Sequence, residues 1–341
     1  MTNRGRLGAP PGGLRVAVTG PTGTFGFGLI PLLEADPRIA TIVGVARRPF
    51  DPAEHGWSKM TYRQGDVRDP QSLAEAFEDA DVVVHLAFLV TGTSSAETAR
   101  AINVDGTINA FRAAASAHAK RFVYASSVAA YGFHADNPIG ITEDWPTRPD
   151  HRFFYAEEKA ELEGLLATEA EAHPDLALYL LRPPIVLGPH AVGGKDILPN
   201  VLGPLLGGAA RLIDRLPVRV PVALPDLPMQ FIHEQDVGHA FVQCIVGAGP
   251  PGAFNIAGDG IVTAHDVARE VGLLPLAVPD AVARNTARAL ASLPRPAFVP
   301  PIAGWVATLG QPAIVDTTKA REQLGWAPTF SGLAALRATL R

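Results

Sequence analysis

Short apolar runs alternate with longer amphipathic segments through the first half of the chain. Runs rich in Val, Ile, Leu and Ala, each of a length typical of a buried β-strand, lie at residues 14–19, 41–46, 81–86, 121–125 and 176–181. Segments with a helical pattern lie at 25–34, 96–118 and 153–172. This alternation predicts right-handed βαβ units, and such apolar strands are typical of a parallel sheet covered on both faces.

The second half of the chain lacks this alternation. From Pro183 to Pro228 it is rich in proline, glycine and leucine with little periodicity, and prolines recur between Pro275 and Pro301, where they limit helix length. The pattern elsewhere predicts helices at 233–246, 264–271, 316–324 and 333–340 and a short strand at 253–256. We therefore expect a regular α/β unit followed by a less regular region.

Composition narrows the class of protein. The 341 residues suffice for one large domain or two closely joined ones, and 47% hydrophobic with 18% charged residues argues against extensive disorder. Cys244 is the single cysteine, which excludes an internal disulfide and a cysteine-based zinc site. The formal net charge is -5 without a basic stripe, so nucleic acid is not an expected partner.

The chain has no pattern typical of membrane or metal binding. No apolar run approaches the roughly 18 residues of a membrane helix, and residues 1–13 lack the apolar core of a secretory signal. We predict a flexible tail at 1–13 and a cytoplasmic location, in agreement with the single cysteine. No metal is expected, because the histidines lack ligand spacing; His233, Glu234 and Asp236 are expected to hold a domain junction instead.

The connection after the first predicted strand has the spacing of a phosphate-binding turn. Gly20, Gly23 and Gly26 stand three residues apart between that strand and the next helix. They permit a tight turn, close approach of a pyrophosphate, and close packing of helix on strand, respectively. The helix start adds free N–H groups that favour an anion. The turn predicts a dinucleotide site formed by Gly20, Thr22, Gly23, Thr24, Phe25 and Gly26. A glycine-rich connection without a ligand is the alternative.

The end of the second predicted strand indicates which dinucleotide binds. An acidic residue there would accept hydrogen bonds from the adenosine ribose, but the strand ends at Ala46, followed by Arg47 and Arg48. A guanidinium group pairs well with a phosphate, so we predict NADP as the cofactor. The alternative is that NAD binds and that both arginines are solvated surface residues. Asp66, after the third strand, is a candidate contact for the adenine amino group.

A tyrosine and a lysine four residues apart form the candidate catalytic pair. Tyr155 and Lys159 lie on one face of a predicted helix, where a lysine is expected to lower the tyrosine pKa from about 10. This spacing alone is common. Its position strengthens it, because Ser126 and Ser127 follow a strand at the sheet edge where ligands bind, and a serine hydroxyl there can hydrogen-bond a substrate oxygen.

With these motifs in place, the chain resembles the extended short-chain dehydrogenases/reductases of the NAD-dependent epimerase/dehydratase family. The matching stretches are Thr19–Gly26, Gly65–Val67, His85–Ala87, Asn103–Thr107, Ala125–Gly132, Tyr155–Lys159, Leu181–Pro183, Phe231–Asp236 and Lys319–Trp326. The resemblance implies a Rossmann doubly wound parallel sheet at 14–184 and 232–256. It implies a smaller substrate-binding domain at 185–231 and 257–341.

The resemblance also implies roles for residues. Tyr155 would be the acid/base, Lys159 its tuner, and Ser127, rather than Ser126, the second ligand of the substrate oxygen. Further cofactor contacts would be Val67, Leu86, Ala87, Phe88, Asn103, Ala125, Tyr155, Lys159 and Pro183. Asn103 is expected to be structural rather than chemical. Substrate contacts would be Ser127, Tyr155, Pro184, Ile185 and Met229. The helices at 96–118 and 153–172 resemble those of the family's dimer interface, so a homodimer is expected.

Departures from the family pattern bear on the reaction. Val128 and Ala129 replace the acid–base pair that 4,6-dehydratases carry after the catalytic Ser/Thr. Ile185 and Met229 replace polar residues of nucleotide-sugar epimerases, and no arginine lies between residues 296 and 320. A sugar diphosphate would lose charge-assisted hydrogen bonds there. This favours a small apolar substrate, unless Arg211, Arg215 or Arg219 serves instead.

The sequence thus predicts an NADP-dependent oxidoreductase that moves a hydride between nicotinamide and a carbonyl or secondary alcohol. A nucleotide-sugar 4-epimerase with the same catalytic residues is the first alternative. A non-catalytic NADP-binding redox sensor is the second, although an intact Ser127, Tyr155 and Lys159 argues against it. The glutamates at 157, 158, 161 and 163 are expected to form a solvated helix face, and Cys244 to be buried.

Overall fold

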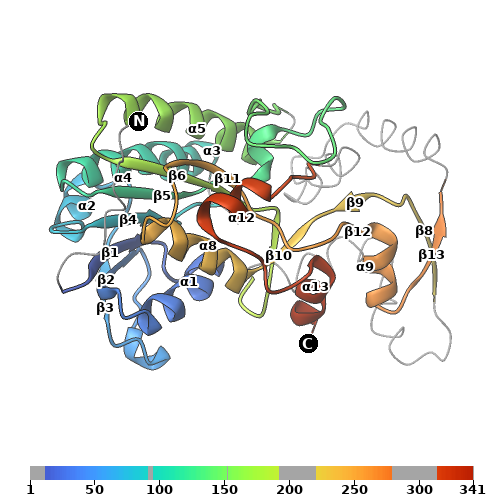
Figure 1. Cartoon of the computed structure of the whole chain (residues 1–341), viewed down its shortest axis with the longest axis horizontal. Helices are drawn as coiled ribbons and strands as arrows, with labels where there is room; N and C mark the ends of the chain where they lie inside the picture. The colour runs from blue at the N-terminus through green and yellow to red at the C-terminus, as the bar shows by residue number, and fades with distance from the viewer. Residues whose placement is uncertain (1–11, 91–94, 152, 192–219, 279–312, 341) are drawn as a thin grey trace.

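A seven-stranded parallel sheet forms the centre of the fold in the computed structural model, which describes residues 12–90, 95–151, 153–191, 220–278 and 313–340 (Figure 1). Its strands are β1 (Leu14–Thr19), β2 (Ile39–Ala46), β3 (Met60–Gln64), β4 (Val82–His85), β5 (Arg121–Ala125), β6 (Ala177–Arg182) and β11 (Gly252–Asn255). They run in the order β11-β6-β5-β4-β1-β2-β3, which reverses direction between β1 and β4. The predicted α/β fold class with a Rossmann sheet is confirmed.

Helices cover both faces of this sheet. One face carries α1 (Thr24–Ala35), α8 (Glu234–Ile245) and α12 (Thr318–Leu324); the other carries α2 (Pro70–Ala76), α4 (Gly106–Ser116) and α5 (Phe154–Ala172). Alternate residues of a strand point to opposite faces, so Val16 and Val18 join the first apolar layer and Ala17 joins the second. Both layers are buried, which explains why the strands are apolar without interruption.

The long helix expected at 96–118 is interrupted. It consists of α3 (Ala96–Arg100), a π-helical turn η2 (Ala101–Asp105) and α4. Thr107 donates its hydroxyl hydrogen to the Asn103 carbonyl at 2.5 Å, which satisfies an acceptor that the regular helix would have used. Such π turns occur mostly inside α-helices and often near functional sites. Two short 3-10 helices, η1 (Pro52–His55) and η3 (Val128–Tyr131), complete this half.

Short strand pairs make up most of the remainder, on the right of Figure 1. They are β7 (Ile185–Leu187) with β10 (Phe231–His233), β9 (Pro228–Met229) with β12 (Val262–Thr263), and β8 (Pro221–Leu224) with β13 (Leu274–Ala277). The helices α9 (Ala264–Glu270) and α13 (Gly332–Leu340) match predicted ones. Strands this short show no periodicity in a sequence, so they were not predicted. The division into two domains stays a prediction.

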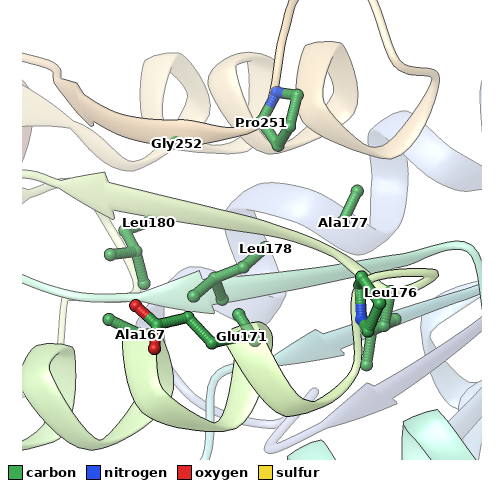
Figure 2. Close-up of a pocket in the computed structure, with 10 residues that line it drawn as sticks. Ala167, Glu171, Leu176, Ala177, Leu178, Leu180, Pro251 and Gly252 are labelled. Atoms are coloured by element: carbon green, nitrogen blue, oxygen red, sulfur yellow. The ribbon is translucent and has the colours of Figure 1, made fainter.

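An apolar groove of about 470 Å³ lies between the carboxyl-terminal half of α5 and strand β6 (Figure 2). Leu176, Leu178 and Leu180 line it together with Pro251, and Glu171 brings a carboxylate to it. None of the predicted site residues lines this groove. Within the described ranges, no helix is both long and apolar enough to span a membrane.

Candidate functional site

The carboxyl ends of β1, β2 and β4 meet where the strand order reverses. The N–H of Gly20, the first residue after β1, donates to the Val45 carbonyl at 2.8 Å, and the Leu86 N–H donates to the Thr19 carbonyl at 3.1 Å. The turn after β1 therefore lies between the ends of two neighbouring strands. Ligands of open parallel sheets bind at such a switch point.

The glycines of this turn have the geometry that a pyrophosphate requires. Gly20 has a φ of +71°, and a Cβ there would lie 2.9 Å from the Ala87 nitrogen; a Cβ on Gly26 would lie 2.0 Å from the Pro21 carbonyl oxygen. A Cβ on Gly23 would meet nothing closer than 3.5 Å, so the turn is open on that side. Gly23 also precedes α1 without a side-chain cap, which suits anion binding by the first N–H groups. The turn fits a dinucleotide diphosphate.

The other predicted residues of the turn face different ways. Thr22 is half-buried, and the Thr24 hydroxyl donates to the His190 carbonyl at 3.3 Å. The Phe25 ring lies 6.3 Å from the Phe241 ring of α8. Phe25 therefore packs inward, and only its backbone N–H can contact a phosphate.

Arg47 and Arg48 follow β2 and are both exposed. Gln64 donates to the Arg47 carbonyl at 2.9 Å, and the Tyr62 hydroxyl donates to the Arg48 carbonyl, so their backbone is fixed. Nearby, the Arg68 guanidinium bonds to Asp66 at 2.7 Å and, with a smaller effect from Arg47, lowers the pKa of that carboxyl. The predicted contacts of Arg47 with a phosphate and of Asp66 with adenine stay predictions.

The two serines after β5 have different partners. The Ser126 hydroxyl donates to Glu163 at 2.5 Å. Ser127 caps η3 by accepting from the Ala129 N–H at 3.1 Å, and its side chain shares a hydrogen bond with the Tyr155 hydroxyl. The structure thus brings Ser127, rather than Ser126, to Tyr155. Their catalytic roles stay predictions.

Lys159 lies one helical turn after Tyr155 and is buried. Its ammonium donates to the Ala125 carbonyl at 2.7 Å and to the Tyr124 hydroxyl at 2.9 Å, and it lies 3.7 Å from the centre of the Phe88 ring. Burial lowers the pKa of Lys159 to about 7 and raises the pKa of Tyr155. The expected lowering of the tyrosine pKa is therefore wrong for this structure, because loss of hydration favours the neutral form of both groups.

Asn103 is buried in the π turn η2. Its amide oxygen accepts from the Leu89 N–H at 2.7 Å, and its amide nitrogen donates to the Leu89 carbonyl at 3.1 Å and to Glu158 at 2.8 Å. These bonds fix the loop after β4 against α5, in agreement with the expected structural role. A contact with cofactor stays a prediction.

The glutamates of α5 do not all form a solvated face, which corrects the expectation from the sequence. Glu158 and Glu163 are only 8% and 5% exposed, whereas Glu157 and Glu161 bond to partners nearer the surface. Glu158 and Glu163 lie on the inward face of the helix with Lys159. They are tolerated there because buried hydrogen-bond donors satisfy both carboxyl groups.

Aromatic side chains surround Tyr155. The Phe88 ring meets it edge-on at 5.5 Å, and the Phe153 ring lies at 5.7 Å. Phe133 lies 6.3 Å from Phe153 and extends this wall. The hydroxyl that would meet a substrate therefore stands in an apolar setting.

The predicted substrate contacts of the second half lie in apolar packing. Pro184 is buried, and Ile185 of β7 and Met229 of β9 both pack against the cluster that contains Leu187 and Phe231. No charged side chain stands at these positions. Arg211, Arg215 and Arg219, the candidates for a displaced diphosphate contact, lie outside the described residues.

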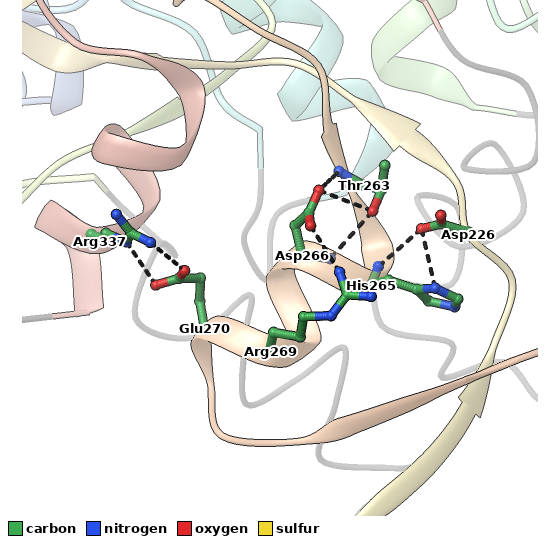
Figure 3. A network of polar contacts seen from close by, with 7 residues as sticks. All are labelled: Asp226, Thr263, His265, Asp266, Arg269, Glu270 and Arg337. Atoms are coloured by element: carbon green, nitrogen blue, oxygen red, sulfur yellow. Dashed lines mark hydrogen bonds and ion pairs between the residues drawn. The ribbon is translucent and has the colours of Figure 1, made fainter.

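Each arginine that the structure describes after residue 219 is paired with a carboxylate. Figure 3 shows two of them, Arg269 bonded to Asp266 at 3.0 Å and Arg337 bonded to Glu270 at 2.7 Å. The third is Arg321, which bonds to Asp259 at 2.7 Å. The Arg337 pair joins α13 to α9 and the Arg321 pair joins α12 to the segment after β11, whereas the Arg269 pair lies within α9.

His233 and Asp236 contact the segment between α12 and α13. The expected role of His233, Glu234 and Asp236 in holding a domain junction stays a prediction. Asp236 accepts from the Thr329 and Phe330 N–H groups at 2.8 and 3.0 Å, and the His233 ring stacks on Phe330 at 4.0 Å. Cys244 is buried as expected, and burial raises the pKa of its thiol. In the described part of the chain, no three His, Cys, Asp or Glu side chains lie close enough to share a metal ion.

The sheet topology and the glycine turn agree with the family to which the chain is related. Residues 16–257 match the NAD dependent epimerase/dehydratase family. The chain belongs to this family. Its fold is that of an NAD(P)-binding oxidoreductase, and its relatives in the family are epimerases, dehydratases and dehydrogenases.

Individual relatives are distant. An uncharacterized protein of Mycobacterium tuberculosis is 27% identical over 333 residues, which cover 94% of this chain and 81% of the relative. A 3beta-hydroxysteroid-dehydrogenase/decarboxylase of Arabidopsis thaliana is 26% identical over 155 residues, 46% of this chain and 34% of the relative. The structure of a UDP-glucose 4-epimerase from Thermotoga maritima superposes with a TM-score of 0.70 at 19% identity and covers 96% of this chain and 97% of that one. The last likeness concerns the fold alone.

The sequence analysis missed one buried group near the candidate catalytic residues, the carboxylate of Glu163. Glu163 stands four residues after Lys159 and eight after Tyr155, so helical spacing places all three on one face. Arg182, its partner, stands in the family stretch Leu181–Pro183. That spacing was the available signal, but a glutamate in a charged helix is more often exposed.

Proposed function

We propose that this protein is an NADP-dependent oxidoreductase that interconverts a carbonyl and a secondary alcohol on a small, apolar, non-nucleotide substrate. The observation that most directly supports this function is the hydrogen bond between Ser127 and Tyr155 at the carboxyl edge of the sheet. Lys159 lies one turn further along α5. The open glycine turn at the same edge supports dinucleotide binding. A cytoplasmic homodimer is part of the same proposal.

Different side chains would transfer the proton and position the substrate and cofactor. Bound nicotinamide would supply or accept the hydride. Tyr155 would give a proton to the carbonyl oxygen, or take it from the alcohol, and its raised pKa means that it holds that proton at neutral pH. Ser127 would hydrogen-bond the same oxygen as negative charge develops on it. Lys159 would hold cofactor hydroxyls.

The surroundings of Tyr155 support an apolar substrate. Phe88, Phe133 and Phe153 form an aromatic wall beside it, and apolar side chains stand at 185 and 229. The arginines described in the second half are engaged in ion pairs. A sugar diphosphate would need donors that these positions do not supply.

The test is the single substitution Tyr155→Phe, which removes the transferable proton and keeps the ring. We expect turnover of carbonyl substrates with NADPH to fall by at least about 100-fold, with cofactor affinity changed by no more than a few-fold. Lys159→Met should reduce both. Near-normal turnover by Tyr155→Phe would refute the acid/base assignment.

The same assay separates the alternatives. Steady consumption of NADPH supports an oxidoreductase. A tightly retained, non-exchanging cofactor together with conversion of a nucleotide sugar would instead indicate a 4-epimerase. Cofactor binding without turnover of any carbonyl compound or sugar would indicate a redox sensor.

A further inference from the structure

A buried ion pair lies directly beneath the candidate catalytic residues. The side chains of Glu163 and Arg182 are only 4% and 6% exposed. Arg182 donates from Nε to Glu163 Oε1 at 2.9 Å and from Nη2 to Oε2 at 2.5 Å, in a two-pronged geometry. A buried charge pair is costly to desolvate and is weak evidence for stability by itself. A contribution to stability is therefore not a sufficient explanation for this buried pair.

The pair is the centre of a series of hydrogen bonds that joins α5, β6, η3, β11 and the residue after β5. On one side, Ser126 at the end of β5 donates to Glu163. On the other, Arg182 of β6 donates to the Tyr131 hydroxyl of η3 at 2.6 Å, and Tyr131 donates to Asn255 of β11 at 2.8 Å. Glu163 itself belongs to α5. These hydrogen bonds thus connect the helix that carries Tyr155 and Lys159 to the turn that carries Ser127.

Ser127 is held at both ends of its turn by this arrangement. Ser126 precedes it and bonds to Glu163, while Tyr131 closes η3 and bonds to Arg182. The Val128 N–H, between them, donates to the Pro183 carbonyl at 3.1 Å. Without Glu163, Ser126 would lose its bond to α5, and the Ser127–Tyr155 hydrogen bond would remain.

The same carboxylate contributes to the charge balance around Lys159. The groups that face Lys159 are Tyr124 from β5, His85 from β4, and Tyr155, Glu158 and Glu163 from its own helix. Burial lowers the pKa of Lys159, while the charges of Glu163 and then Glu158 raise it. Burial also lowers the pKa of His85, to about 3, so this ring stays neutral near pH 7.

We propose that Glu163 is a positioning residue: through Ser126 and Arg182 it sets the Ser127 turn against α5, and its negative charge keeps the buried Lys159 ammonium protonated. The inference rests on the proposed function only in so far as Ser127, Tyr155 and Lys159 form its site. Loss of the Glu163 charge leaves Glu158 as the one carboxylate named above that raises the pKa of Lys159. Lys159 then loses its proton at lower pH, with no change in the residues that touch substrate.

The experiment follows the protonation of Lys159 directly by NMR titration of the full-length protein labelled with 13C at lysine Cε. The chain has five lysines, at 59, 120, 159, 195 and 319, and Lys159→Met assigns the signal of interest. In the parent protein we expect a midpoint near 7. In Glu163→Gln, which keeps size and shape, the midpoint should fall by about one pH unit or more.

Glu161→Gln is the matched control, because Glu161 lies on the same helix but pairs with Arg100 near the surface. It should leave the Lys159 midpoint unchanged. If Glu163→Gln does not fold, Glu163→Gln combined with Arg182→Gln removes both buried charges and keeps hydrogen-bonding groups. In that variant too the midpoint should fall by about one pH unit or more, because the Glu163 charge that raises it has gone; an unchanged midpoint would refute the charge balance described here.

The outcomes separate this inference from the proposed function. An unchanged Lys159 midpoint in Glu163→Gln would overturn the inference, whatever the substrate. Retained turnover by Tyr155→Phe would overturn the function and leave the titration result standing. Once a substrate is known, Ser126→Ala should lower kcat more than it raises KM, and an unchanged kcat would refute the positioning part.

Discussion

At the scale of single residues, burial controls the chemistry of the site. Tyr155 and Lys159 share one apolar environment, and burial shifts both toward their neutral forms, with the pKa of Lys159 lowered to about 7. A tyrosine that keeps its proton is suited to act as an acid toward a carbonyl oxygen. The charges that remain nearby, chiefly on Glu163, therefore decide the state of the lysine.

The arginines after β2 give a prediction about cofactor choice. NADPH should bind more tightly than NADH, by about 1–3 kcal/mol, since Arg47 offers a charge-assisted fork for the 2′-phosphate. Arg47→Ala should remove most of that difference and leave NADH binding almost unchanged. Calorimetric titration of both cofactors checks this, with Arg63→Ala on the neighbouring strand β3 as the control. Equal affinity of the unmodified protein for the two would place Arg47 on the solvated surface.

The low pKa of Lys159 predicts a pH-dependent contribution to stability. Between about 7 and the ordinary value of 10.5, the unfolded chain binds this proton and the folded protein does not, so the free energy of unfolding rises with pH through this window. Below pH 7 the folded protein carries the full cost of a buried ammonium. The stability of the parent relative to Lys159→Met should therefore increase from pH 7 to pH 10. Parallel curves from denaturant unfolding across that range would contradict the shift.

At the scale of elements, glycines decide how closely α1 and α8 approach each other. A Cβ on Gly28 would lie 2.2 Å from the Glu234 carbonyl oxygen, and a Cβ on Gly238 would lie 2.2 Å from the Gly28 carbonyl oxygen. Both contacts are with backbone atoms, which cannot turn aside. The two helices cover the same face of the sheet and join the phosphate-binding turn to the second half of the chain.

This contact predicts opposite effects for two glycine substitutions. Gly28→Ala should lower the free energy of unfolding by about 1–3 kcal/mol, because the helices must separate. Gly164→Ala in α5, where a Cβ would meet nothing within 4 Å, should raise it by up to about 1 kcal/mol through helix propensity. Denaturant titrations of the two variants provide the comparison. Equal effects would show that packing between α1 and α8 does not limit their distance.

At the scale of the whole molecule, the two halves of the chain are built differently. The central sheet, with apolar layers on both faces, takes β1 to β6 from residues 14–182 and β11 from further along the chain. The other described residues after 183 form short strand pairs and helices, two of which are joined by the ion pair of Arg337 with Glu270 (Figures 1 and 3). Under the proposed function, the sheet edge holds the dinucleotide and the less regular part determines which substrate binds.

This difference leads to a prediction about nucleotide sugars. With NADP saturating, UDP-, GDP- and dTDP-sugars should neither raise the melting temperature nor be converted, while apolar aldehydes, ketones or secondary alcohols should raise it. A ligand at 100 times its dissociation constant adds about 2.7 kcal/mol, which a melting screen detects. A clear shift with one nucleotide sugar, abolished by replacing Arg211, Arg215 or Arg219, would restore the epimerase.

The sequence by itself determined the fold class, the glycine turn and the candidate trio Ser127, Tyr155 and Lys159. These features are local: a strand, a turn of fixed spacing, or two residues one helical turn apart appear directly in the order of residues. The strands β1, β2, β4, β5 and β6 and the helices α1 and α5 lie close to their predicted ranges for the same reason.

Only the tertiary structure decided the state of the charged groups. Glu158 and Glu163 can be buried because Asn103 and Arg182, distant in sequence, donate hydrogen bonds to them. The tyrosine pKa rises rather than falls since burial outweighs the hydrogen bond with Ser127, which lowers it. The burial and the charge partners of a side chain depend on residues from several chain segments that meet in the fold. No single stretch of sequence therefore predicts them.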